Sequence, residues 1–356
     1  MISADWHIKK NNRIFAHNPE IVNDLAIAID FVSDFIFENK IDAVLLAGDV
    51  FDQSFVTSYS IDLIKKFIHA CKSKDTKIFF IQGQHDKSEI PLLLAIDDYC
   101  QYVHNKSFSI NNLKFFGWDF EVNPEQIGKK EHILFTHLTF KELTNFLFGN
   151  ATLEQSLSDI VISGDFHGFR FLQNKDKILL SPGPLVFQKL NQTDQKVIVL
   201  VDSSLHIQSV PVPQREIHIR EITNKGDFDD LLRFCENYQY NYNLPQDIRR
   251  PILVLNYNPE IVTEEKLQFV KEKFILFLNI MTSNNNEFLI PKLDISSSFD
   301  VNSLIFQIVD RLETKVEIKK LLLDYIANED LTVFERYLEE GYVQIEKSDN
   351  KKPLSV

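Results

Sequence analysis

The sequence is poor in cysteine, has no long apolar run and carries no excess of positive charge. Its three cysteines include no Cys-x-x-Cys pair, which indicates free thiols in a reducing compartment and not a disulfide framework. The stretch "FILFLNIM", among the longest apolar runs, is far too short to cross a membrane. The N-terminus has no apolar stretch behind a basic one, so it does not resemble a signal peptide. We therefore expect a cytoplasmic protein.

The net charge of −13 argues against a nucleic-acid partner, because nucleic-acid-binding proteins are usually basic on at least one face. Bound divalent cations can reverse the local sign of an acidic site, however, so the charge has to be weighed against the motifs. The basic residues Lys9, Lys10 and Arg13 are compatible with a polyanion contact and equally with a solvated turn. Length and composition are those of an ordinary globular protein with two or three domains.

Five segments of the first half share one pattern, in which a short apolar run is followed by a glycine or small residue and then by residues that bind metals. The segments are MISADWH (1–7), DAVLLAGDVFD (42–52), TKIFFIQGQHD (76–86), EHILFTHL (131–138) and SDIVISGDFHG (158–168). Apolar runs of this length predict buried strands. Helical patterns lie between them, at 18–40 and 58–74, and this alternation predicts an α/β sheet.

Ligands collect at the carboxyl ends of the strands in open α/β sheets, so we expect these five turns to meet at one edge. Each turn alone is a weak signal. An Asp after a strand also serves as a helix N-cap, and a lone His137 is more often a satisfied core histidine than a ligand. Their occurrence together, in order and each after a strand, predicts a metal site.

These residues resemble the signature of the calcineurin-like metallophosphoesterases: D-x-H, G-D-x-x-D, G-N-H-D, a lone His and G-H-x-H. Here the signature reads Asp5–His7, Gly48–Asp52, Gly83–Asp86, His137 and Gly164–His167. The layout of residues 1–210 is similar to one branch, the SbcD-type DNA exonuclease subunit, which includes the meiotic recombination eleven nuclease and its counterpart in T4-like phages. The stretch "LLSPGPLVFQ" at 179–188 is also similar to that branch. The resemblance implies an α/β fold, a four-layer α-β-β-α sandwich with a smaller α/β capping domain and C-terminal helices.

The resemblance also implies roles for individual residues. Two divalent metal ions, Mn²⁺ in preference to Mg²⁺, would be held by Asp5, His7 and His167 at one position, by Gln84, His137 and Asp165 at the other, and by Asp49 as a bridge between them. His85 would be the general acid for the departing sugar oxygen, with Asp52 or Asp86 orienting its imidazole.

Two of these positions depart from the family pattern, and both fall on the second metal. Gln84 stands where the family has Asn, and Asp165 where it has His. Gln keeps the amide oxygen but adds a methylene, whereas Asp replaces a neutral imidazole by a charged oxygen ligand. A decayed site is the alternative, but we expect Asp165 to remain a ligand, since carboxylates also bind these metals. The first strand is short before Asp5, which leaves open a start codon upstream.

After about residue 213 the pattern changes. "REIHIREI" (215–222) and "RPILVLNY" (250–257) read as strands, and 227–238 and 263–278 as helices. Residues 214–295 thus resemble the capping domain of the SbcD branch. Residues 301–342 predict an amphipathic helical hairpin, which in that family binds a coiled-coil ATPase; packing on the capping domain explains the pattern equally well. The predicted domains are therefore 1–213, 214–295 and 296–356.

We therefore expect a two-metal DNA exonuclease and endonuclease, the nuclease subunit of an SbcC/SbcD-like complex for DNA repair and recombination. Its expected partners are DNA, an SbcC-type coiled-coil ATPase and a second copy of the chain. The alternatives are a metallophosphoesterase of small phosphoesters and a catalytically weakened scaffold for the ATPase. In that branch, helices at 58–72 and 91–102 form a dimer contact, for which Leu63, Phe67, Leu93 and Ile96 are candidates unless they face the sheet.

Overall fold

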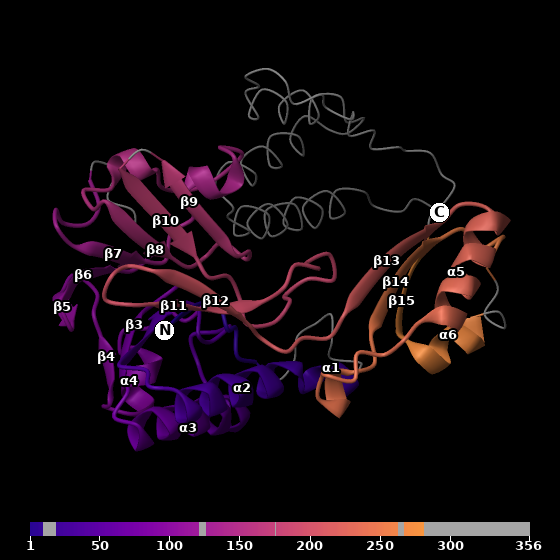
Figure 1. Ribbon diagram of the computed structural model, residues 1–356, viewed down its shortest axis with the longest axis horizontal. Helices are drawn as coiled ribbons and strands as arrows, with labels where there is room; N and C mark the ends of the chain where they lie inside the picture. Colours follow the sequence, from indigo (N-terminus) through magenta and orange to yellow (C-terminus); the bar gives the residue numbers. More distant parts are fainter. Residues whose placement is uncertain (10–18, 121–125, 175, 263–266, 281–356) are drawn as a thin grey trace, which may run out of the picture. The chain divides into compact units, whose positions relative to one another are not determined.

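The computed structural model describes residues 1–9, 19–120, 126–174, 176–262 and 267–280 (Figure 1). The chain divides at residue 285 into two units, and every described residue lies in the first. The helical hairpin expected at 301–342 therefore lies outside the described residues, and the three domain boundaries stay predictions. Among the described residues, none of the helices combines the length and the apolar character that crossing a bilayer requires.

The first sheet contains the strands of the first three motifs. Its order is β12-β11-β1-β2-β3-β4, with the strands β1 (Ile2–Ser3), β2 (Ala43–Ala47), β3 (Lys77–Ile81), β4 (Cys100–Tyr102), β11 (Val197–Val201) and β12 (Ile207–Pro211). Strands β1 to β4 are parallel, and β11 joins β1 antiparallel. All of β2 is buried, as expected for a parallel strand that is covered on both faces.

The second sheet contains the strands of the last two motifs. Its order is β5-β6-β7-β8-β10-β9, with the strands β5 (Ser107–Ile110), β6 (Leu113–Trp118), β7 (Ile133–Thr136), β8 (Ile160–Ser163), β9 (Arg170–Asn174) and β10 (Lys177–Ser181). The two sheets pack face to face, since Leu45 and Phe79 of the first share one core cluster with Phe135 and Ile162 of the second. The segments that follow the carboxyl ends of β1, β2, β3, β7 and β8 therefore meet at one edge.

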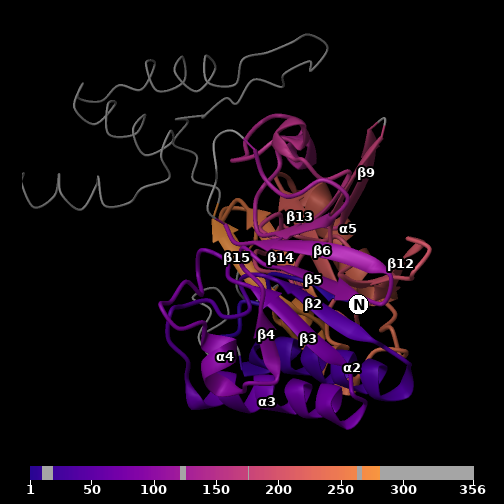
Figure 2. The same ribbon diagram turned by 90° about the vertical axis from the view of Figure 1, so that its left-hand side faces the viewer.

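Helices cover the outer face of the first sheet (Figure 2). They are α2 (Asp24–Glu38), α3 (Ser58–Ser73) and α4 (Leu92–Ile96). The short helix α1 (Pro19–Val22) precedes them, and its Ile21 packs in a different cluster with Ile252 and Val254. Successive side chains of β2 point to opposite faces of the sheet. Val44 and Leu46 pack against the helices, and Leu45 packs against the second sheet. The outer face of the second sheet is covered by the segment that holds two 3-10 helices, Lys141–Thr144 and Leu153–Gln155. The predicted α/β sandwich is confirmed.

The candidate dimer residues face the interior. Leu63, Phe67 and Leu93 are buried in the cluster between the helices and the first sheet, and Ile96 is half-buried against it. Phe67 packs edge-on against Trp6, with ring centroids 4.9 Å apart. The interpretation that these side chains face the sheet is therefore correct, because an amphipathic helix turns its apolar stripe towards the core. The predicted homodimer itself stays a prediction.

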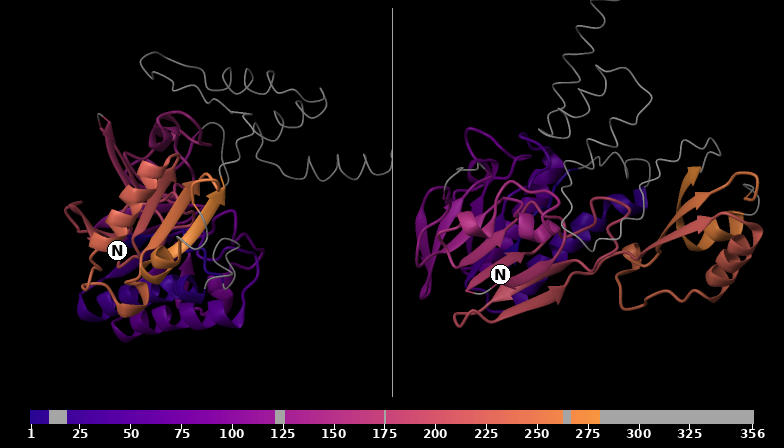
Figure 3. Two further views of the ribbon diagram at one scale, coloured as in Figure 1. Left: turned by 90° about the vertical axis from the view of Figure 1, so that its right-hand side faces the viewer. Right: turned by 90° about the horizontal axis from the view of Figure 1, so that it is seen from above.

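A third sheet follows in the chain, with β13 (Ile217–Ile222), β14 (Ile252–Tyr257) and β15 (Ile275–Ile280) all parallel (Figure 3). Helices α5 (Lys225–Asn237) and α6 (Gln268–Lys273) pack on one face of it. The predicted helix at 263–278 is wrong at its end, since Ile275–Leu278 belongs to β15. A short apolar run does not reveal by periodicity whether it is a buried helix or a buried strand, and pairing with β14 decides the matter here.

Arg215 ties the third sheet to the helices of the first. The buried guanidinium donates to both carboxylate oxygens of Asp24, from Nε at 2.9 Å and from a terminal nitrogen at 2.8 Å. It also donates to the backbone carbonyls of Glu20, Asp247 and Arg250. Each of the three guanidinium nitrogens thus donates a hydrogen bond, and a buried charge requires such partners.

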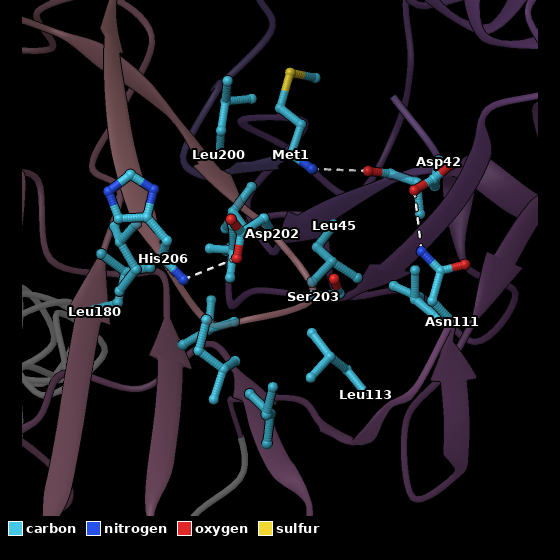
Figure 4. A pocket seen from close by; sticks show the side chains of 18 of the residues that line it. Met1, Asp42, Leu45, Asn111, Leu113, Leu180, Leu200, Asp202, Ser203 and His206 are labelled. Carbon is cyan, nitrogen blue, oxygen red and sulfur yellow. Dashed lines mark hydrogen bonds between the residues drawn. The ribbon is translucent and has the colours of Figure 1, made fainter. Parts of the chain in front are cut away.

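A cavity of about 410 Å³ opens between the two large sheets at the edge where their parallel strands begin (Figure 4). Leu45, Leu113 and Leu180 line it together with polar residues such as Asp42 and Asn111. None of the predicted metal ligands lines this cavity, because the ligands follow the opposite ends of the same strands.

Replacing Arg215 by Met should lower the free energy of unfolding by about 3–5 kcal/mol, because Asp24 would stay buried without its cation. Urea denaturation measures the change. Arg233→Met is the control, since it removes an ion pair with Asp230 whose side chains are 71% and 70% exposed, and it should change stability little. Equal effects of the two substitutions would contradict the structural role given to Arg215.

Candidate metal centre

Five predicted ligands, from both large sheets, come together at the shared edge of the sandwich. The Nε2 atoms of His7 and His167 are 3.2 Å apart, although 160 positions separate them in the sequence. His137 Nε2 lies 3.3 Å from Asp49 Oδ2 and 4.0 Å from Asp5 Oδ1. Three sets of possible ligand atoms lie within 4.8 Å of one another among the described residues: Asp5 with His7 and His167, Asp5 with Asp49 and His137, and His7 with Asp52 and His85.

Three buried atoms in this cluster have no hydrogen-bond partner among the described residues: Asp5 Oδ2, Asp49 Oδ2 and His137 Nε2. His137 donates from Nδ1 to the Ala47 carbonyl at 2.6 Å, so that Nε2 faces the carboxylates and, once deprotonated, would direct its lone pair at a metal between them. Such a second hydrogen bond is what orients a metal-binding imidazole. Buried polar atoms without partners are costly, and a divalent cation bound beside them would supply a partner. The residues therefore fit the metal that the motifs predict.

The backbone at the ligand positions is left-handed. Asp5, His7, Asp49 and Asp165 have φ values of 53°, 46°, 50° and 71°. A non-glycine residue in this region costs roughly 1–3 kcal/mol, which persists only where the surroundings hold it in place. Four such residues among seven predicted ligands indicate that the loops are shaped to aim these side chains.

Two motif glycines allow the loops to approach the ligands closely. A Cβ at Gly83 would lie 2.0 Å from Asp49 Oδ1, and a Cβ at Gly164 would lie 2.1 Å from the Ala47 carbonyl and 2.5 Å from His137 Nδ1. Any larger residue would push the ligand side chains away. Steric crowding by the ligand side chains and the neighbouring backbone thus explains why a glycine occupies these two positions.

The structure places Asp52 beside His7 and Lys9. Its Oδ1 is 3.0 Å from His7 Nδ1, and its Oδ2 is 2.5 Å from Lys9 Nζ. Asp52 thereby orients the His7 ring so that Nε2 faces the cluster. Lys9, which the sequence placed in a small basic group, forms an ion pair here, and the other two members of that group lie outside the described residues.

Asp86 joins two motif loops instead of contacting the His85 ring. It accepts the backbone N–H groups of Val50 at 2.8 Å and Gly83 at 2.7 Å. The backbone N–H of His85 donates to Asp49 Oδ1 at 2.9 Å, and its exposed ring lies 5.0 Å from the His7 ring. Among the described hydrogen bonds, neither Asp52 nor Asp86 contacts the His85 ring. The predicted role of His85 as a general acid is therefore supported only by the position of its ring next to His7.

Gln84 and Asp165, the two departures from the family pattern, contact each other. Gln84 Nε2 donates to Asp165 Oδ1 at 2.6 Å, and the Thr139 hydroxyl donates to Asp165 Oδ2. The Asp165 backbone N–H donates to Asp5 Oδ1 at 3.1 Å. Thr139 was missed from the sequence, although its spacing of two residues from His137 in an extended segment was a usable signal.

The charges of the cluster shift its pKa values strongly. Burial raises the pKa of Asp5 to about 7, and burial lowers that of His167 to about 4. Burial also lowers the pKa of His137, but the facing Asp49 and Asp5 carboxylates outweigh it and raise the value well above normal. Burial raises the pKa of Asp49, yet the His137 imidazole brings it well below its usual range. Asp49 and His137 thus form an ion pair in the protein without metal.

The comparison with known families agrees with this geometry, since residues 1–262 match the calcineurin-like phosphoesterases. The chain belongs to that family. Its members use divalent metal ions, so the protein is a metal-dependent phosphoesterase. No curated protein matches the sequence.

Several solved structures are similar to part of the chain. An archaeal phosphodiesterase is 18% identical, covering 59% of this chain and 98% of that one with a TM-score of 0.35. The protein TT1561 of Thermus thermophilus is 12% identical, covering 59% and 96%, with a TM-score of 0.38. The phosphopantetheinyl hydrolase of Mycobacterium tuberculosis is 10% identical, covering 52% and 89%, with a TM-score of 0.31. At these TM-scores the neighbours do not refine the family assignment.

Metal binding to this phosphoesterase should release protons and weaken as the pH falls. Asp5, with its pKa of about 7, and His137, with its raised pKa, must both lose protons before they bind a cation. At about pH 7, Mn²⁺ uptake should release on the order of one proton per chain. Calorimetry in buffers of different ionisation enthalpy measures the number. An affinity that does not change between about pH 6 and pH 8 would contradict these pKa shifts.

Gly83→Ala should weaken Mn²⁺ binding by at least about tenfold, because the new Cβ would displace the Asp49 carboxylate. Gly226→Ala is the matched control. It lies in α5, where the nearest atom to a new Cβ is the Asn224 side-chain oxygen at 3.1 Å, and it should leave metal affinity unchanged. Metal content after dialysis distinguishes the two; unaltered binding by the Gly83 variant would show that this close approach is not required.

Proposed function

We propose that this phosphoesterase is a DNA nuclease, acting as exonuclease and endonuclease in an SbcC/SbcD-like complex. The observation that carries the hydrolytic function is that Asp5, Asp49 and His137 come together, each with a buried atom that has no hydrogen-bond partner among the described residues. DNA as the substrate is supported by the resemblance of residues 1–210 to the SbcD branch. The third sheet, β13 to β15, follows where that branch has its capping domain.

The residues of the centre divide the work of phosphodiester hydrolysis among them. Asp5, Asp49 and His137 would hold divalent metal ions, whose chemistry when bound would be to polarise the phosphate and to acidify a water molecule. Asp49 is the natural shared ligand, because one of its oxygens is unpartnered while the other accepts the His85 backbone N–H. His85 is exposed beside the ligands, where its ring can donate a proton to the departing sugar oxygen.

Two other functions remain as alternatives. Hydrolysis of small phosphoesters needs the same centre and no DNA. A weakened scaffold for the ATPase is disfavoured by the left-handed backbone at four ligands, since such strain has no use in a site that has lost its metal. Nuclease assays with Mn²⁺, with and without an SbcC-type ATPase, and a parallel assay on a small phosphodiester separate the three functions.

Asp49→Asn should abolish hydrolysis of DNA without unfolding the chain, because a neutral amide cannot hold two cations together. Initial rates with Mn²⁺ measure the loss, and circular dichroism checks the fold. If the Asp49→Asn variant keeps activity within about tenfold of the parent, Asp49 is not a ligand shared by two cations.

His85→Ala should lower the rate by roughly 10²–10⁴ while the bound metal persists, because it removes a proton donor and no ligand. His69→Ala, at an exposed position of α3, is the control and should be fully active. Metal content must be measured beside the rate. If the His85 variant loses its metal, the side chain is a ligand and its proposed role as general acid is wrong.

A further inference from the structure

Gln84, Asp165 and Thr139 form one hydrogen-bonded unit at the edge of the metal centre. Gln84 Nε2 and the Thr139 hydroxyl each donate to a different oxygen of Asp165. An ionised carboxylate only accepts hydrogen bonds, so the amide has to turn its NH₂ group towards it. Ligating carboxylates are commonly held by such donors. The two departures from the family pattern are thus complementary to each other and not independent losses.

Asp165 lies beside His137, one of the residues that would hold a cation. Its Oδ1 lies 3.9 Å from His137 Nε2, which in turn lies 3.3 Å from Asp49 Oδ2. Neighbouring ligand atoms around one cation with bonds of about 2.1 Å are separated by roughly 3–4 Å. His137 Nε2 and Asp49 Oδ2 are also atoms without a hydrogen-bond partner among the described residues.

The two cation positions therefore differ in chemistry. Beside Asp5, the imidazoles of His7 and His167 approach each other at 3.2 Å, and nitrogen ligands of this kind suit manganese, iron or zinc. Beside His137 there is one imidazole, and the remaining groups are the carboxylates of Asp5, Asp49 and Asp165. Oxygen-rich positions suit hard cations such as Mg²⁺.

We propose that Asp165, fixed by Gln84 and Thr139, makes the position beside His137 selective for a hard cation, so that the centre binds two unlike metals. A transition metal occupies the position of His7 and His167, and Mg²⁺ occupies the position of His137, Asp49 and Asp165. This inference concerns metal selection alone. It holds whether the substrate is DNA or a small phosphoester, and its test needs no substrate.

The test uses the full chain, stripped with a chelator and then given two equivalents of Mn²⁺ in an about 100-fold excess of Mg²⁺. The parent should retain one Mn²⁺ per chain, with the electron paramagnetic resonance spectrum of an isolated ion. The double variant Gln84→Asn/Asp165→His, which restores the family pattern, should retain two and show a spin-coupled pair. Two Mn²⁺ in the parent, or the same content and spectrum in both proteins, would overturn the proposal.

The double variant should keep its backbone at position 165, where φ is 71°, because histidine adopts left-handed backbone more readily than most residues.

A second variant, Thr139→Val, tests the proposal if the double variant binds no metal. Thr139→Val leaves every proposed ligand in place and removes only a donor to Asp165. It should weaken Mg²⁺ binding by about 10–100-fold and leave the first Mn²⁺ unaffected. Thr193→Val, at an exposed position, is the control. Unchanged Mg²⁺ affinity in the Thr139 variant would show that Asp165 does not select the cation.

Discussion

The buried carboxylate of Asp49 is the constraint on which the rest of the centre depends. It lies at the end of β2, with one oxygen unpartnered among the described residues and the other accepting a backbone N–H. Burial alone would drive this group to its neutral form, yet the facing His137 keeps it ionised. A charge in such a place is stable only beside cations. Without metal, the positive charge beside Asp49 is that of the protonated His137 imidazole. When a metal binds, its charge would replace that of the proton.

Two rigid sheets make this arrangement possible. The loops that carry Asp5 and Asp49 leave one sheet, and those that carry His137 and Asp165 leave the other. The interface between the sheets is a packed core, which fixes the spacing between the two halves of the centre. Strained backbone and close glycine contacts are tolerated at this edge because the core over-determines where each loop begins.

Much of this centre could be predicted from the sequence, because each ligand follows a short apolar run. Runs such as AVLLA and KIFFI form strands where the pattern placed them, and the positions after them converge. Two other outcomes have a common origin. The end of the predicted helix at 263–278 is a strand, and Phe67 faces the sheet, which was one of the two interpretations of its helix. In both cases the apolar pattern predicts that a segment is buried and does not identify what buries it.

The sequence by itself determined the kinds of ligands, their order and the glycines between strand and ligand, since these depend on local chemistry and on sterics within a few residues. Only the tertiary structure decided which of them meet. It placed Asp52 on His7 and Asp86 on two backbone loops, and it joined Gln84 to Asp165 through a hydrogen bond across 81 positions. Such contacts depend on how the two sheets stack. A local sequence pattern does not predict which side chain on another strand will be the partner.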